Sequence, residues 1–152
     1  MHFKHDLLMA KRITVVPTAG NAFVDLFRTI VGSLPEEVAQ EYAWYVVRLY
    51  GEGDMPRAVG RTMSDVLETI DQRGALPLSW PELEMMSRTM WQIFDLVVVG
   101  VAGGSAKVSP EDNGFDALVN AYGIVIEAFD SSEWRIGGRD ERLIASVAAS
   151  LA

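Results

Sequence analysis

The sequence predicts an all-α fold: a bundle of about six helices around a central apolar helix, with a short extended arm at the N-terminus. Two observations support this prediction. Apolar residues recur at spacings of three and four along most of the chain. A start signal of serine, proline and glutamate, typical of a helix N-terminus, occurs three times, at residues 33–36, 79–82 and 109–111.

The central helix is expected over residues 79–104, SWPELEMMSRTMWQIFDLVVVGVAGG. Its first half is amphipathic, but the polar stripe ends after Asp95, so other helices must surround the second half. Residues 96–102 also fit a buried strand, and the pattern leaves helix and strand open there. The glycines that follow match neither the dinucleotide-binding nor the P-loop fingerprint. Gly100 and Gly104 would allow close approach of a neighbouring helix, which leaves self-association open.

The other helices are placed by apolar periodicity and by their stop residues. We expect residues 1–20 to form an arm with a brief strand near Ile13–Val16, and residues 21–152 to form one helical domain. Residues 75–78 and 131–138 are expected to be connections. In chain order, the flanking helices are expected at residues 22–33, from Pro35 to Gly51, from Pro56 to Gly74, from Ser109 through Phe129, and after Asp140.

The charge of the chain restricts its partners. The formal net charge is −8, from 13 basic and 21 acidic residues. Such a chain repels nucleic-acid phosphates and anionic lipid, so we expect no nucleic-acid binding and no membrane binding, and a basic protein partner instead. The longest nearly uncharged run, residues 90–106, is shorter than a membrane span of about 20 residues. With no cysteine and no convincing secretory signal, the expected location is cytoplasmic.

The first candidate site is a row of polar residues on the helix expected after Ser109. At helical spacing these side chains share one face beside the apolar stripe. An ordinary solvated face would look similar, but this one lacks interspersed lysines, which favours a docking surface for a basic partner. The predicted partner-binding residues are Asp112, Asp116, Asn120, Glu127 and Asp130.

The second candidate site is a set of acids on two helices expected to be antiparallel. Glu37 and Glu41 are four residues apart, and Glu68 and Asp71 are three apart, so each pair lies on one helix face. Oxygen ligands in this arrangement suit Mg²⁺. The pattern resembles that of the MazG-type nucleotide pyrophosphatases, and this resemblance implies an all-helical Mg²⁺-dependent phosphohydrolase with these four acids as ligands. Gln40 stands where that family has a further glutamate.

A third candidate is Asp95, a carboxylate beside a nearly all-apolar stretch, which we expect to point toward Arg88 in a buried polar site. Both histidines, His2 and His5, lie in the expected arm, so a catalytic triad is disfavoured. The sequence therefore favours a small acidic non-enzymatic protein-binding domain without a cofactor, such as an inhibitor, an immunity-like protein or an adaptor. The alternatives are the Mg²⁺-dependent phosphohydrolase and a self-associating structural protein.

Overall fold

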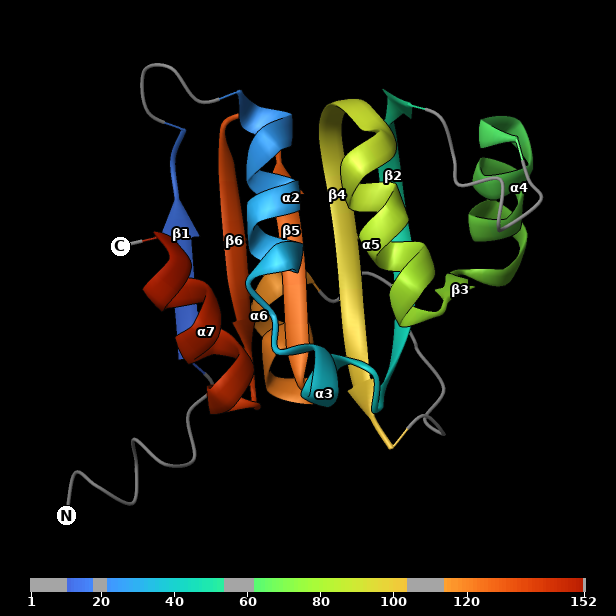
Figure 1. The fold of residues 1–152 in the computed structure, drawn as a ribbon. Coiled ribbons are helices and arrows are strands. Elements are labelled where there is room, and N and C mark those ends of the chain that lie inside the picture. The colour runs from blue at the N-terminus through green and yellow to red at the C-terminus, as the bar shows by residue number, and fades with distance from the viewer. Residues whose placement is uncertain (1–10, 18–21, 54–61, 104–113, 152) are drawn as a thin grey trace, which may run out of the picture.

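The computed structural model describes residues 11–17, 22–53, 62–103 and 114–151 and has an α+β fold, so the all-α prediction is wrong. Six strands form one sheet in the order β1-β6-β5-β4-β2-β3, and every neighbouring pair is antiparallel (Figure 1). The strands are β1 (Lys11–Val15), β2 (Tyr42–Gly53), β3 (Leu76–Leu78), β4 (Met90–Ala102), β5 (Ile124–Phe129) and β6 (Glu133–Gly138). The helices are α2 (Phe23–Gly32), α3 (Glu36–Ala39), α4 (Met63–Arg73), α5 (Trp80–Thr89), α6 (Gly114–Ala121) and α7 (Glu141–Leu151).

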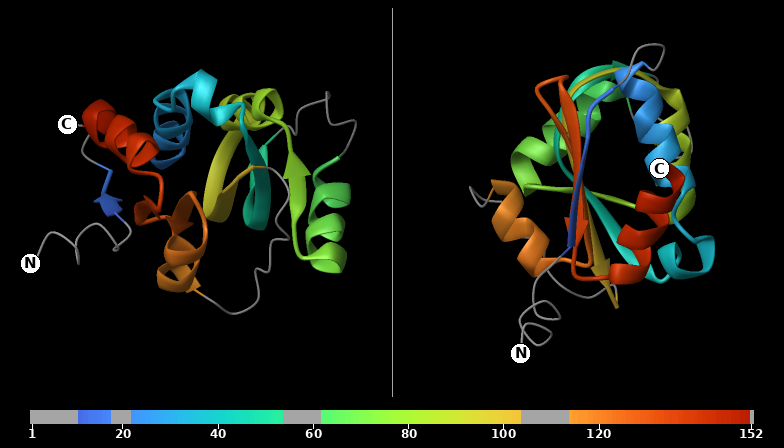
Figure 2. Two further views of the ribbon diagram at one scale, coloured as in Figure 1. Left: turned by 90° about the horizontal axis from the view of Figure 1, so that it is seen from below. Right: turned by 90° about the vertical axis from the view of Figure 1, so that its left-hand side faces the viewer.

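The helices form unequal layers on the two faces of the sheet. Figure 2 shows α2, α5 and α7 on one face and α6 on the opposite face. The larger hydrophobic core lies under the first layer and includes Phe27, Trp44, Leu83 and Trp134. A smaller apolar cluster lies between α6 and the sheet. Helix α4 packs beside β2 and β3 at one edge of the sheet (Figure 1).

The expected central helix over residues 79–104 is a helix followed directly by a strand. Helix α5 ends at Thr89, and β4 begins at Met90, whose backbone is already extended. The second half is rich in β-branched residues, which pack well on a pleated surface. An apolar run with no polar face suits a strand covered on both faces as well as it suits a buried helix. Helices α2 and α5 cover one face of β4, and α6 covers the other face as far as Val97.

The helix expected from Pro35 to Gly51 is only one turn long. Helix α3 ends at Ala39, and the aromatic and β-branched run that follows forms β2. Ser33 does not cap α3; its hydroxyl donates to the Ile30 carbonyl at the end of α2. The spacing of the apolar residues in this segment fits both the period of a helix and that of a strand. Pairing with β4 along the whole of β2 stabilises the strand.

The helix expected from Ser109 through Phe129 is also too long. Helix α6 ends at Ala121, and β5 begins at Ile124 after Gly123. A side chain at Gly123 would collide with the ring of Tyr42, so this close approach requires glycine. Two segments expected to be connections are also strands. They are β3, within residues 75–78, and β6, within residues 131–138.

Most of the remaining elements confirm the predictions. Helices α2 and α7 lie where the periodicity places them, and β1 forms in the predicted arm. Helix α4 ends at the predicted Gly74 but begins only at Met63, after the capping residue Thr62, instead of after Pro56. Ser79 and Glu82 form the predicted capping box at the start of α5. Gly74 ends α4 in the left-handed conformation. No helix in the described ranges is both long and apolar enough to cross a membrane.

Gly100 provides a test of this packing. A Cβ atom at position 100 would lie 2.7 Å from Cγ2 of Ile124 and 2.9 Å from Cζ3 of Trp44. Both neighbours are fully or nearly fully buried, so they have little room to move. We expect Gly100→Ala to lower the free energy of unfolding by about 1 to 3 kcal/mol, measured by urea denaturation.

Gly32→Ala is the matched control, because a Cβ atom at this last residue of α2 would meet nothing within 4 Å. We expect this variant to be as stable as the wild type or slightly more stable. If Gly100→Ala unfolded at the same urea concentration as Gly32→Ala, the close packing between β2, β4 and β5 would be contradicted.

Candidate functional site

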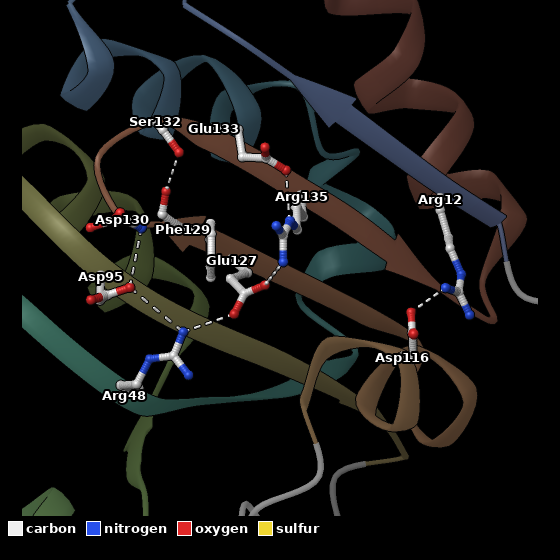
Figure 3. A network of polar contacts seen from close by, with 10 residues as sticks. All are labelled: Arg12, Arg48, Asp95, Asp116, Glu127, Phe129, Asp130, Ser132, Glu133 and Arg135. Atoms are coloured by element: carbon white, nitrogen blue, oxygen red, sulfur yellow. Dashed lines mark hydrogen bonds and ion pairs between the residues drawn. The ribbon is translucent and has the colours of Figure 1, made fainter.

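The face of the sheet that carries α6 is only half covered. Leu118 and Val119 of α6 pack on Val97, Val99 and Val125. Toward the turn between β5 and β6 the cover ends, and the strands carry charged and aromatic side chains (Figure 3). We name this part of the sheet the open half-face, and it consists of Arg48, Tyr50, Phe94, Asp95, Glu127, Phe129, Asp130, Glu133 and Arg135.

Strand register brings these residues together. Glu127 pairs with Val97 on one side and with Arg135 on the other, and Val97 pairs in turn with Arg48. The register shifts between Val46 and Arg48, which adds one residue to β2 at this point. Such a bulge re-aims a side chain, and here it turns Arg48 toward Glu127.

Glu127 lies at the centre of an ion-pair network although its side chain is only 7% exposed. Arg48 Nη2 donates to Glu127 Oε2 at 2.8 Å. Arg135 Nη1 lies 3.6 Å from Glu127 Oε1, and this oxygen has no hydrogen-bond partner. Burial of a carboxylate is costly unless cations and donors compensate for the lost water, so the two arginines are what allow an acid in this position.

Arg135 is the most constrained base of the open half-face. Its Nε donates to Glu133 Oε2 at 2.7 Å, and its guanidinium lies 4.0 Å from the centre of the Phe129 ring. The hydrogen bond to Glu133, together with the charges of Glu133 and Glu127, raises the pKa of Arg135 above its ordinary value. A cation stacked on an aromatic ring between two carboxylates is thus fixed in place within the chain.

Asp95 and the turn after β5 form the other end of the open half-face. Asp95 Oδ1 accepts from the backbone N–H of Asp130 at 3.3 Å, and it lies 3.8 Å from Arg48 Nη2. The N–H of Ser131 donates to the Phe94 carbonyl at 2.9 Å, which holds the turn against β4. The rings of Tyr50 and Phe94 are 5.4 Å apart and lie next to Asp95, because Tyr50 is the residue paired with Asp95.

The structure separates the five predicted partner-binding residues. Asp116 and Asn120 lie on α6, where Asp116 pairs with Arg12, whereas Glu127 lies on β5 and Asp130 in the turn that follows. Asp112 lies outside the described residues. The single helix face that would unite them does not form, because α6 ends before Glu127. Of the predicted set, only Glu127 and Asp130 belong to the open half-face.

The four predicted metal ligands are not brought together. Glu37 lies on α3 and Glu41 just before β2, while Glu68 and Asp71 lie on α4. Helices α3 and α4 are far apart in Figure 1. Within the described ranges, no group of three or more histidine, cysteine, aspartate or glutamate side chains is placed to hold a metal ion. The pair of antiparallel helices that the MazG-type resemblance implies is likewise not formed.

The predicted contact between Asp95 and Arg88 is also absent. Arg88 is exposed on α5 and pairs with Glu84, 3.7 Å away on the same helix, whereas Asp95 lies on β4 near Arg48. Sequence reasoning did not find Arg48, Arg135 or Tyr50. The available signal was alternation: residues two apart in a strand share a face, and Arg48 with Tyr50 and Glu133 with Arg135 have this spacing.

A second polar cluster lies at the start of α7 and supports the fold. The Tyr42 hydroxyl donates to Asp140 Oδ2 at 2.6 Å, and the N–H and side chain of Arg142 also donate to Asp140. Burial alone would raise the pKa of the Asp140 carboxyl, but these hydrogen bonds outweigh it and lower the pKa. Burial, and then the bond to Asp140, raise the pKa of the Tyr42 hydroxyl.

No family model matches the chain, and comparisons with curated proteins and with solved structures found no similar protein. The geometry of the chain itself is therefore the basis for its proposed function. That geometry offers exposed aromatic rings, paired charges and one nearly buried carboxylate on an incompletely covered sheet face.

Replacing Arg48 and replacing Glu127 should lower the stability of the fold by different amounts. Arg48→Met leaves the buried Glu127 without its one hydrogen bond, so we expect a loss of about 2 to 3 kcal/mol in the free energy of unfolding. Glu127→Gln leaves two partly exposed arginines that water can solvate, and we expect a loss of about 1 kcal/mol or less. Urea denaturation of both variants measures the difference.

The double variant Arg48→Met/Glu127→Gln completes the cycle. Because no buried charge remains without a donor, it should be more stable than the sum of the two single changes implies, by about 1 to 2 kcal/mol. Strictly additive losses would mean that the two side chains do not interact in solution.

Asp140 yields a pH-dependent prediction. Because the pKa of Asp140 is lower in the folded state, its carboxylate stabilises the fold above its unfolded pKa, about 4, and this contribution is lost as the pH falls through the folded pKa. At pH 7, Asp140→Asn should lower the free energy of unfolding by about 1 kcal/mol. The gap to the wild type should narrow steadily below about pH 4.

Tyr42→Phe is the control for this change, because it removes one donor to Asp140 and leaves the carboxylate. Thermal unfolding followed by circular dichroism at several pH values would measure all three proteins. A gap between wild type and Asp140→Asn that is as wide at about pH 2 as at pH 7 would contradict the assignment.

Proposed function

We propose that the chain is a non-enzymatic protein-binding domain and that the open half-face is its contact surface for a basic partner. The single observation that carries this proposal is the half-covered sheet face with its exposed rings. Tyr50 is 66% exposed and Phe129 is 40% exposed, beside the ion-pair network. Aromatic residues and arginine are the side chains most enriched where proteins bind each other tightly.

The charge of the open half-face supports a basic partner. Its ionisable acids and bases are two arginines and four carboxylates, so their formal charges sum to −2. The chain as a whole carries −8. A basic partner would be attracted over long range by the overall charge and would find the carboxylate of Asp130 unpaired at the surface itself.

The two alternatives have less support from the described residues. The four acids of the phosphohydrolase alternative do not gather. The self-association alternative relied on Gly100 and Gly104. Gly100 is buried inside the sheet against Ile124, Trp44 and Tyr42, and Gly104 lies outside the described residues.

Affinity capture from an extract of the native cells tests the proposal. The immobilised wild-type chain is compared with Tyr50→Ala/Phe129→Ala, which removes the exposed rings but no charge. The matched control is Leu67→Ala/Met85→Ala, because each of these residues is 41% exposed, on α4 and α5 respectively, and neither belongs to the open half-face.

We expect a basic protein that the wild type and the control retain equally and that the aromatic double variant retains at least about tenfold less, the effect of losing about 1.4 kcal/mol. Thermal unfolding of each variant shows whether the fold is intact. Equal retention by the aromatic variant and the control would contradict the proposal. Retention of a second copy of the chain alone would favour the self-association alternative.

A further inference from the structure

The open half-face contains two arrangements of aromatic rings with two carboxylates, and only in the first does a cation of the chain pair with both carboxylates. In the first, the guanidinium of Arg135 lies over the Phe129 ring and interacts with Glu133 at 2.7 Å and with Glu127 at 3.6 Å. The components are therefore an aromatic ring, two carboxylates and a planar cation. Figure 3 shows these residues beside Asp95 and Asp130.

The second arrangement has rings and two carboxylates, but its nearest cation, Arg48, pairs with Asp95 and not with Asp130. Asp95 and Asp130 are adjacent, because the N–H of Asp130 donates to Asp95 Oδ1 at 3.3 Å. The rings of Tyr50 and Phe94 contact each other; Tyr50 is paired with Asp95 across the strands, and Phe94 precedes it in β4. Among the described residues, the carboxylate of Asp130 has no hydrogen bond and no ion pair.

Arg48 does not fill this second arrangement. Its Nη2 donates to Glu127 at 2.8 Å and lies 3.8 Å from Asp95, which is beyond hydrogen-bond distance. Glu127 needs that bond, because its side chain is more than nine-tenths buried and its other oxygen, Oε1, accepts no hydrogen bond. Arg48 pairs with Glu127 and, at a longer distance, with Asp95, but not with Asp130, and the formal charges of these four residues sum to −2.

We propose, resting on the function proposed above, that this second arrangement binds an arginine side chain of the basic partner. The guanidinium lies against the Tyr50 and Phe94 rings and donates to the carboxylates of Asp95 and Asp130. A planar guanidinium satisfies two carboxylates and stacks on a ring at the same time, whereas a lysine ammonium is a more strongly hydrated point charge without a plane. The charge of −2, the unpaired carboxylate of Asp130 and the exposed Tyr50 ring select this occupant.

An acetylated and amidated tetra-arginine peptide, with tetra-lysine as its comparison, tests this inference without a cellular partner. Binding is followed by the shifts of backbone amide signals in two-dimensional NMR. We expect tetra-arginine to shift the signals of Phe94, Asp95 and Asp130 and to bind at least about threefold more tightly than tetra-lysine, because only arginine gains from stacking.

The decisive variant is Asp95→Asn/Asp130→Asn. An asparagine at position 95 can still accept from the N–H of residue 130, and asparagine tolerates the positive φ of 49° at position 130, so the turn is retained. Glu68→Gln/Asp71→Asn removes the same charge from α4 and is the matched control. We expect the first variant to weaken tetra-arginine binding about tenfold and the control to leave it unchanged.

Tyr50→Leu separates stacking from charge, and it should reduce the affinity for tetra-arginine to that for tetra-lysine. Equal weakening by the α4 variant, or no weakening by Asp95→Asn/Asp130→Asn, would overturn the inference. If the captured partner depended on Tyr50 and Phe129 while the peptide ignored Asp95 and Asp130, the inference would fail and the proposed function would stand. If tetra-arginine bound as expected but no partner were captured, the inference would stand and the proposed function would fail.

Discussion

The two-sided burial of β4 is the constraint on which the rest of the structure depends. From Leu96 to Val101 every side chain is buried, so this part of the strand requires cover on both faces. Helices α2 and α5 lie on one face, and α6 covers the other only as far as Val97. Before that point β4 carries Asp95, which an apolar cover could not accept without a partner. The open half-face thus begins at Asp95, where the apolar residues on the α6 side of β4 end.

Local signals in the sequence predicted the start of α5 and the end of α4 correctly, but not the fold class. The capping box of Ser79 and Glu82 and the left-handed Gly74 each act within one turn, and both were found. Whether residues 90–102 form a helix or a strand depends on pairing with β2 and β5, which lie far away in sequence. Apolar residues on every side satisfy a buried helix and a buried strand equally, and the preference of β-branched residues for strands was the better indicator here.

The candidate site was only partly predictable for the same reason. The acids of the open half-face were identifiable by type, and Asp95 by its apolar surroundings. Their grouping depends on strand register and on a bulge in β2, which sequence spacing does not reveal. The predicted partner-binding residues that the structure describes do not share one helix face but lie on α6, on β5 and in the turn after β5. Paired charges of this kind contribute little net stability, and under the proposed function they would set the specificity of the contact surface.

Amide hydrogen exchange along β4 tests the central claim most directly. If β4 is the strand at the centre of the sheet, amides from Leu96 to Val101 should exchange only on global unfolding and be the slowest in the chain. The part of β4 before Asp95, where the register with β2 is irregular, should exchange faster through local opening. Uniformly fast exchange from Met90 to Ala102 would contradict a sheet organised around β4, and with it the open half-face.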